Sequence, residues 1–417
     1  MHSVAKVGDP FLLGVNYWPR QKAMYWWRDF DAGEVRDEFA MIRGIGLTHV
    51  RFFLLWESFQ PRVDHIDSVA IGNLRTVCDI AQEVGLRLQP TFFTGHMSGP
   101  NWAPNWLLSH VRRQPSNRQI VSLSDPRGSD RAIYNLYTEP FVIEAEDRLL
   151  RAVCGELKDH PAIWAWSLGN EPDLFCRPPS AFAGRQWIAD RAATIKSVDR
   201  VHPVLIGLHL ASLDEDVGLR VDHIAQVTDI SVMHGYSIYH SLARTPLDPD
   251  FVPFTCALTT ALAQRPVLYE EFGVNTGWPD GPSRWEHVRQ WDGSTRKIYF
   301  ASEEDAAKYY AAVLPRLARV GALGAFCWCF GDYDSCVWDR PPCDWQPHER
   351  FFGLVRADGS IKPMGRAVAD FAMSEPRIKA AENLVQLDGN VDEFYYECGD
   401  QSRELYRRFC NSSDLDL

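Results

Sequence analysis

The sequence predicts an α/β fold, a (β/α)8 TIM barrel with long βα loops on its C-terminal face. Short apolar runs alternate along the chain with amphipathic stretches that end at Gly. This repeated β-then-α order indicates a parallel sheet, and eight such units favour a closed barrel over an open doubly wound sheet. The length of 417 residues and the 46% hydrophobic content suffice for one large core. Barrels of this kind often reach such lengths as a single domain.

The candidate strands are residues 11–17, 49–55, 86–93, 162–168, 203–208, 229–234, 266–271 and 324–330. Between them, residues 33–46, 69–85 and 304–321 carry apolar side chains at helical spacing. We predict a catalytic barrel over residues 8–372. Residues 373–417 contain further helix-like pieces, and we expect them to form a tail packed on the barrel.

The gaps between strand starts are longest after the third and seventh candidate strands, at 76 and 58 residues. These insertions are expected on the C-terminal face, where barrel enzymes keep their sites. Many of the fifteen Trp residues fall in predicted βα loops, namely Trp18, Trp26, Trp27, Trp56, Trp102, Trp106, Trp278, Trp285, Trp291, Trp338 and Trp345. Their flat faces suit stacking against sugar rings. We expect about half of them only to pin long loops to the barrel.

Charge and hydropathy narrow the classes of partner. The formal net charge is -12, which disfavours binding to nucleic acid or to an anionic membrane surface. The sequence has no run of 18 apolar residues, so no transmembrane helix is expected. The first 20 residues lack the apolar run of a signal peptide, which predicts a cytoplasmic protein. The oligomeric state stays open, a homo-oligomer included.

Ten cysteines raise the question of a disulfide or a metal site. Cys336 and Cys343 fall in one loop rich in Asp and Trp, where either arrangement would fit. The chain has no CxxC pair and no cluster of His residues near them. Reduced free thiols are therefore the favoured interpretation.

Two carboxylates carry the chemical signal. Asn170, Glu171 and Pro172 end one strand-like run, and Glu271 ends another, 100 residues later. At about 30 residues per βα unit, this spacing places the two Glu residues at the ends of strands 4 and 7, across the barrel mouth. Glycoside hydrolysis uses such a pair. Glu270 is a competing nucleophile, but strand neighbours face opposite sides, so we expect only one of the two to point inward.

The pattern resembles glycoside hydrolase family 5 in clan A, the cellulase–mannanase family. The resemblance implies that Glu171, following Asn170, is the acid/base and that Glu271, preceding Phe272 and Gly273, is the nucleophile. It also implies substrate-site roles for Arg51, His96, Asn170, His234, Tyr236 and Trp328. Trp56 and Trp102 are predicted to join them as substrate-binding residues.

The resemblance gives most of these residues a distinct task. Arg51 and Tyr236 would stabilise the charge of the nucleophile, and Trp328 would form the floor under the terminal sugar. Asn170 would bind the sugar 2-hydroxyl. A lone His on a strand is usually structural, so His96 and His234 are assigned only because they match the family in order. This chemistry requires no metal and no organic cofactor, and none is predicted.

The sequence favours an exo-acting, retaining β-mannosidase that cleaves short manno-oligosaccharides. Long loops could wall off one end of a groove, and a cytoplasmic enzyme would meet short imported sugars. The stretches GVNYWP (residues 14–19) and FFTGHMSGPNWAPNWL (residues 92–107) are similar to the β-mannosidase and mannanase side of the family. The alternatives are an endo-β-1,4-mannanase or β-glucanase with an open cleft, an inverting enzyme, and a non-catalytic carbohydrate-binding barrel.

Overall fold

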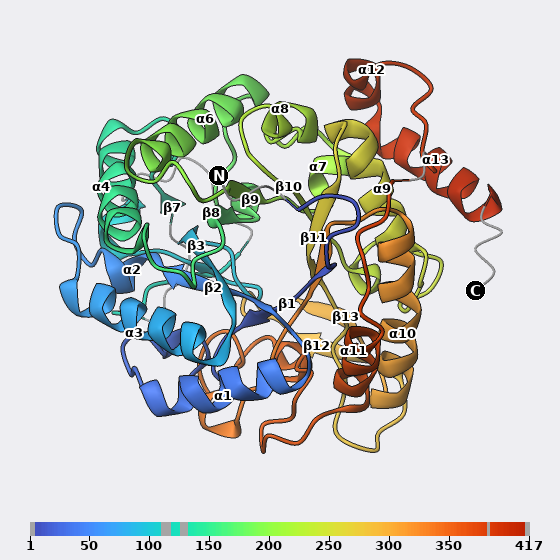
Figure 1. Ribbon diagram of the computed structural model, residues 1–417, viewed down its shortest axis with the longest axis horizontal. Coiled ribbons are helices and arrows are strands. Elements are labelled where there is room, and N and C mark those ends of the chain that lie inside the picture. Colours follow the sequence, from blue (N-terminus) through green and yellow to red (C-terminus); the bar gives the residue numbers. More distant parts are fainter. Residues whose placement is uncertain (1–4, 110–117, 126–131, 382–383, 413–417) are drawn as a thin grey trace.

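The computed structural model describes residues 5–109, 118–125, 132–381 and 384–412. It shows a ring of strands enclosed by helices (Figure 1). The barrel strands are β1 (Leu12–Tyr17), β2 (His49–Leu55), β3 (Arg87–Thr94), β8 (Trp166–Asn170), β9 (Val204–Gly207), β10 (Ser231–His234), β11 (Val267–Phe272) and β14 (Gly324–Cys327). All eight predicted strands are present, and the predicted TIM barrel is confirmed.

The eight strands are parallel and follow the order β10-β11-β14-β1-β2-β3-β8-β9. Two backbone hydrogen bonds close the ring between β9 and β10. The Asp229 amide donates to the Val204 carbonyl over 2.8 Å, and the His234 amide donates to the Leu208 carbonyl over 2.8 Å. Every position of β2, β8 and β11 is buried, as expected of strands covered on both faces.

The outer helices are α1 (Ala32–Gly44), α3 (Ser68–Val84), α4 (Pro140–Leu157), α6 (Ala181–Val198), α8 (Val221–Ala225), α9 (Phe251–Ala263), α10 (Glu303–Arg319) and α11 (Pro363–Met373). Several begin at a side chain that accepts hydrogen bonds from the first turn, such as Asp31 before α1 and Asp67 before α3. Helix α3 ends at Gly85, whose φ of 75° favours glycine. The predicted helices over residues 33–46, 69–85 and 304–321 match α1, α3 and α10 to within two residues.

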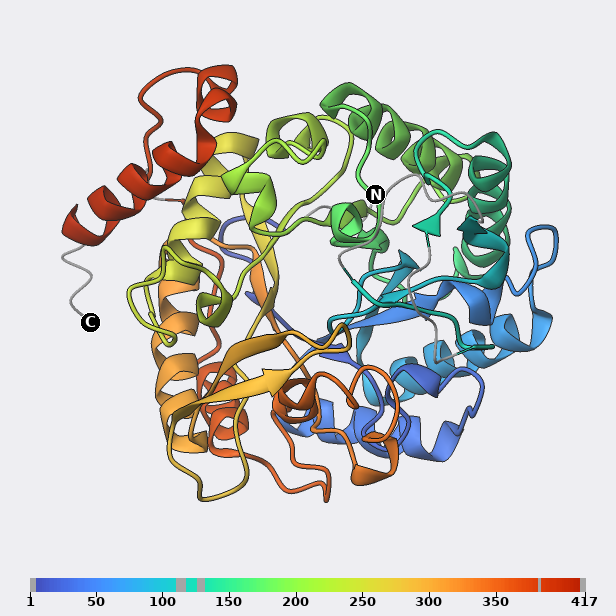
Figure 2. The same ribbon diagram turned by 180° about the vertical axis from the view of Figure 1, so that it is seen from behind.

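Short elements fill the loops: η1 (Ala23–Tyr25), α2 (Trp56–Phe59), β4 (Asn101–Trp102), η2 (Asn105–Leu107), β5 (Leu108–Ser109), β6 (Ile120–Val121), β7 (Ala132–Ile133), α5 (Pro172–Phe175), α7 (Ala211–Asp214), η3 (Ser237–Tyr239), β12 (Arg284–Arg289), β13 (Thr295–Phe300), η4 (Ser335–Val337) and η5 (Pro347–Phe351). Strands β12 and β13 form an antiparallel hairpin, which Figure 2 shows lying across the near face of the barrel. The long insertions after the third and seventh barrel strands are therefore real and follow the carboxyl ends of those strands.

The C-terminal segment contains α12 (Val391–Tyr396) and α13 (Cys398–Ser412), which lie at the outer edge of the molecule (Figure 1). Side chains from this segment contact the barrel. The Tyr395 hydroxyl donates to the Ser212 carbonyl over 3.0 Å, and the Tyr406 hydroxyl donates to Asp248 over 2.6 Å. These contacts anchor both helices to the segments that follow β9 and β10.

All ten cysteines are free thiols, with Cys336 exposed and Cys343 buried. Within the described residues, no helix is both long and apolar enough to cross a membrane.

Candidate active site

The acid/base candidate lies directly after β8. Glu171 adopts a φ of 45°, a left-handed conformation that is unusual for a residue with a side chain. Its amide donates to the Gly207 carbonyl over 3.0 Å, and Pro172 begins α5 immediately after it. Such backbone strain costs about 1–3 kcal/mol and persists where surrounding structure enforces it, often at functional sites. The turn thus fixes Glu171 at the carboxyl end of the barrel.

The nucleophile candidate lies on β11, beside a second buried carboxylate. Arg51 contacts both neighbours: its Nε lies 3.3 Å from Glu270, and its Nη1 donates to Glu271. The expectation that only one of these two Glu side chains points inward was wrong. The register of β11 shifts against both β10 and β14, and this irregularity breaks the strict alternation of side chains. Of the two, only Glu271 lines the cavity described below.

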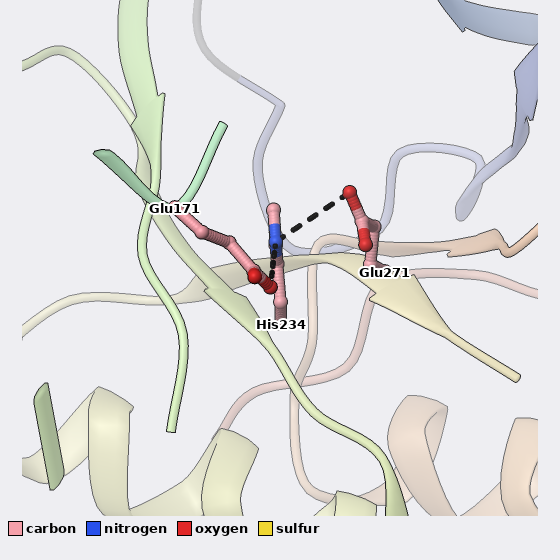
Figure 3. A group of neighbouring side chains, drawn as sticks. All are labelled: Glu171, His234 and Glu271. Carbon is pink, nitrogen blue, oxygen red and sulfur yellow. Dashed lines mark hydrogen bonds and ion pairs between the residues drawn. The ribbon is translucent and has the colours of Figure 1, made fainter. Parts of the chain in front are cut away.

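Glu171 and Glu271 face each other across His234 (Figure 3). One carboxylate oxygen from each Glu and one nitrogen of His234 all lie within 4.8 Å of one another. The His234 Nδ1 lies 3.1 Å from Glu171 and 3.5 Å from Glu271. Its Nε2 lies 2.9 Å from the deeper Glu270. This close approach of Glu171 and Glu271 is compatible with retaining glycosidases, whose two carboxyl groups lie about 5–5.5 Å apart.

A buried network holds the Glu271 carboxylate in place. The Tyr236 hydroxyl donates to its Oε2 over 2.8 Å, while Arg51 contacts its Oε1. Arg51 is fully buried and also donates to the side-chain oxygen of Asn170 over 2.8 Å. The Asn170 amide in turn donates to the His96 carbonyl over 2.9 Å. Because donors converge on Glu271, its charged form is stabilised at the barrel mouth.

The pKa values of His234, Glu271 and Glu171 depend on one another and on the charges beside them. Against the effect of burial, the carboxylates of Glu271, Glu171 and Glu270 raise the pKa of His234 to about 9. Burial and the charge of Glu171 raise the pKa of Glu271, although His234 and Arg51 oppose this. Burial also acts on Glu171, but His209 and His234 outweigh it and lower its pKa. The charged form of His234 is therefore favoured, and it lies beside both catalytic candidates.

A cavity of about 480 Å³ lies above the pair. Seven of the predicted residues line it, namely His96, Asn170, Glu171, His234, Tyr236, Glu271 and Trp328. Arg51 lies beneath, where it contacts the carboxylates and not the cavity. The structure thus brings eight predicted residues together at one place.

Trp56 and Trp102 were predicted to bind substrate, but the structure places both outside this cavity. Each is at most 3% exposed. The Trp56 N–H donates to Gln60 over 2.8 Å, and the Trp102 N–H donates to the Met97 carbonyl over 3.2 Å. Trp56 begins α2, where Trp106 of the long loop after β3 packs against it, and Trp102 lies within that loop, so both indoles are packed with their N–H groups already satisfied. Among all the tryptophans, the cavity lining includes only Trp291 and Trp328.

Several cavity residues escaped prediction: Ser98, Arg118, His209, Gln290, Arg296, Gln346, His348 and Glu349. Most lie on loops, where no fixed spacing marks them. His209 is different, because it comes two residues after β9, and its Nε2 lies 2.8 Å from Asp173. The rule that barrel sites collect at carboxyl ends of strands could have identified it.

Glu171, His234 and Glu271 are, within the described residues, the one group placed closely enough to hold a metal ion. The Arg51 guanidinium already contacts Glu271, and a raised pKa favours the charged form of His234. These positive charges oppose a divalent cation at the same place.

Comparisons with known proteins agree with this geometry. A family model described as "Glycosyl hydrolases family 2, TIM barrel domain" matches residues 129–335, which include both catalytic candidates. Mannan endo-1,4-beta-mannosidase F of Aspergillus clavatus is 26% identical over 168 residues, covering 36% of each chain. A probable mannan endo-1,4-beta-mannosidase A-1 of Aspergillus terreus is 34% identical over 170 residues, covering 36% of this chain and 40% of that one. The matched segments thus span little more than a third of these relatives.

The chain is thus similar to β-mannosidases and mannanases. The resemblance inferred from its motifs is therefore confirmed. The segment between Glu171 and Glu271 supplies three of the eight barrel strands, namely β9, β10 and most of β11.

Solved structures match the barrel over most of its length. GH5_18 from Streptomyces cattleya, in complex with Manβ1-4GlcNAc, is 24% identical with a TM-score of 0.71, covering 88% of this chain and 80% of that one. Exo-beta-1,4-mannosidase Op5Man5 from Opitutaceae bacterium strain TAV5 is 24% identical with a TM-score of 0.70, covering 88% and 60%. At these identities, the likeness establishes the fold of the chain.

Proposed function

We propose that the protein is a family 5 enzyme that hydrolyses β-mannosides with retention of anomeric configuration. The observation that carries this proposal is the pair of carboxylate oxygens, from Glu171 and Glu271, within 4.8 Å of each other at the carboxyl end of the barrel. The names of the curated relatives and of several similar structures support a mannoside as the substrate.

The proposed reaction proceeds by two displacements. Glu271 attacks the anomeric carbon, the bond to the leaving oxygen breaks, and Glu171 gives that oxygen a proton. Glu171 then takes a proton from water, which attacks the glycosyl ester and releases Glu271. Arg51 and Tyr236 hold Glu271 aligned and ionised for the first step. Once the ester forms, the negative charge of Glu271 is lost and no longer raises the pKa of Glu171.

Substrate binding has to redistribute protons before the first step. The pKa of Glu171 is lowered by His209 and His234 against the effect of burial, whereas the acid role needs Glu171 protonated. A glycosidic oxygen beside Glu171 accepts a hydrogen bond from the protonated form and so favours it. His234 lies between the two carboxylates and offers a short route for the proton.

The cavity walls support exo action. A Cβ placed on Gly99, after β3, would lie 2.9 Å from Gln346, which follows β14. Gln346 in turn donates to Gln290, in the β12–β13 hairpin, over 3.0 Å. These loops therefore meet over β1 and β2, which lie between β14 and β3 in the ring. We place the terminal sugar on Trp328 against this wall, with the rest of the substrate toward His209 and Leu210, which follow β9.

An endo-β-1,4-mannanase is the second candidate, and it is favoured by the names of the curated relatives. The two candidates differ in their products. Manno-oligosaccharides labelled at the reducing end should lose one mannose at a time from the other end. Aryl β-mannoside should be cleaved faster than aryl β-glucoside, and proton NMR should show the β-anomer first. Release of internal fragments would reject exo action, and an unreactive mannoside would reject the proposal as a whole.

The cytoplasmic location expected from the sequence stays a proposal. It fits a substrate of short imported oligosaccharides rather than a polymer. Cell fractionation followed by the aryl β-mannoside assay tests it, and activity confined to the secreted or membrane fraction would contradict it.

A further inference from the structure

Glu349 is a carboxyl group of the cavity wall that the proposed hydrolysis does not use. It lies in η5, after β14, and is 8% exposed. Burial raises its pKa to about 7, and the charge of Glu271 adds to this rise. A hydrogen bond with Ser98, the charge of Arg296 and a hydrogen bond with Trp328 oppose it. The Glu349 carboxyl therefore lies near both the proposed nucleophile and the Trp that would carry the terminal sugar.

Two other buried glutamates of this barrel show what a purely structural role looks like. Glu38 accepts hydrogen bonds from Tyr17 and Arg20, at 2.8 Å each. Glu146 accepts hydrogen bonds from Trp187 and Arg191, at 2.9 Å each. Each of these carboxylates is thus paired with a guanidinium, as buried charges usually are.

Glu349 lacks such a partner. Within the described part of the chain, no Arg or Lys lies within ion-pair distance of it. Its neighbour His348 has Nε2 at 3.5 Å, but burial lowers the pKa of His348 to about 3, so that imidazole is neutral. Both residues line the cavity. Ser98 and Trp328 are uncharged hydrogen-bond partners of Glu349, and they leave its two oxygens with further capacity to accept hydrogen bonds from a ligand in the cavity.

We propose that Glu349 is a specificity-determining residue that binds ring hydroxyls of the terminal sugar stacked on Trp328. This inference rests on the proposed function. A carboxyl group offers two oxygens to neighbouring hydroxyls, and the indole beside it packs against the C–H face of the same ring. Glu271, Glu349 and Trp328 line the same cavity, so both carboxyls face a sugar stacked on that indole. Glu349 therefore selects sugars by ring hydroxyls at carbons other than the reacting anomeric carbon.

The test combines a variant with altered substrates. Aryl β-mannosides lacking the hydroxyl at C3, C4 or C6 are compared with the parent sugar, in the wild type and in Glu349→Ala. In the wild type, at least one deoxy sugar should lose about 10-fold or more in kcat/KM, the size of a hydrogen bond to a charged group. Glu349→Ala should lose a similar factor on the parent sugar and show no further loss on that deoxy sugar.

Controls separate this outcome from damage to the fold. Glu349→Gln keeps the shape and one acceptor, so it should fold and lie between the wild type and the alanine variant. Glu38→Gln alters a buried glutamate outside the cavity and should leave every deoxy penalty unchanged. If all three deoxy penalties persist in Glu349→Ala and Glu349→Gln, Glu349 does not bind the sugar. A wild type inactive on the parent mannoside would instead reject the proposed function itself.

Discussion

The floor and the wall of the cavity are built in different ways. The floor residues Arg51, Asn170, His234 and Glu271 lie on barrel strands and are joined largely by ionic contacts. The wall comes from loops, and a neutral hydrogen bond joins Gln290 and Gln346 there. Strand ends hold a side chain more rigidly than loops do. The chemistry therefore depends on the floor, and the choice of substrate depends on the wall.

The largest expected effect lies in the floor. Glu271→Ala should lower kcat on aryl β-mannoside by about 10⁴-fold or more, because no other group can form the glycosyl ester. Azide should restore part of this activity by taking the place of the missing carboxylate and should give the α-glycosyl azide. The matched control is Glu270→Ala, which should not respond to azide because Glu270 does not line the cavity. Rescue of Glu270→Ala alone would exchange the roles of the two residues.

The second expected effect distinguishes the role of Glu171 from that of Glu271. Glu171→Ala should lower kcat/KM on manno-oligosaccharides by about 10²–10⁴-fold, the usual contribution of a general acid. An aryl mannoside with a good leaving group needs less protonation, so its first step should suffer much less. The measurement is the ratio of the two losses, with Glu271→Ala as the reference for equal losses. An equal loss on both substrates would remove the acid role from Glu171.

The floor is also the part of the molecule that the sequence predicts best. Strand ends have a fixed direction, so Glu171 and Glu271 could be placed across the barrel mouth from their positions in the chain alone. Two predictions failed at positions where local packing determines the direction or the burial of the side chain. Glu270 also points inward because the register of β11 shifts, and the folded loop after β3 contains Trp102 and covers Trp56. Neither a register shift nor the packing within a loop leaves a period in the sequence.

The wall was predicted only in outline. The lengths of the insertions after β3 and β11 indicated long loops at the mouth, and the structure has them there. The residues that the wall presents were missed, Glu349 and Arg296 among them. A loop position is set by tertiary contacts, such as that between Gly99 and Gln346, and these join segments far apart in the sequence. Single residues of this kind carry no repeat or spacing that would reveal them.

A third prediction uses the pH dependence of the Tm to distinguish the floor residue His234 from the wall residue Gln346. The carboxylates around His234 raise its pKa from 6.5 to about 9 in the folded protein. This group therefore stabilises the fold fully below about pH 6.5, and the contribution is lost as pH rises through about 9. The Tm should fall across this range, by the equivalent of at most about 3 kcal/mol. His234→Gln should flatten the slope while Gln346→Ala keeps it, and an unchanged slope in His234→Gln would contradict the assignment.

The smallest expected effect lies in the wall. Gln290→Ala removes a neutral hydrogen bond to Gln346. Such a bond is worth about 0.5–1.5 kcal/mol, so kcat/KM on aryl β-mannoside should fall by no more than roughly 10-fold. Its main consequence should appear in the products, because the loops from β3, β11 and β14 would no longer meet firmly over β1 and β2. On labelled manno-oligosaccharides, the variant should release some disaccharide from the non-reducing end. The double variant with Gln346→Ala should lose little more, since both changes break the same bond. If the double variant releases mannose alone, as the wild type is expected to do, the wall is not what limits the enzyme to terminal sugars.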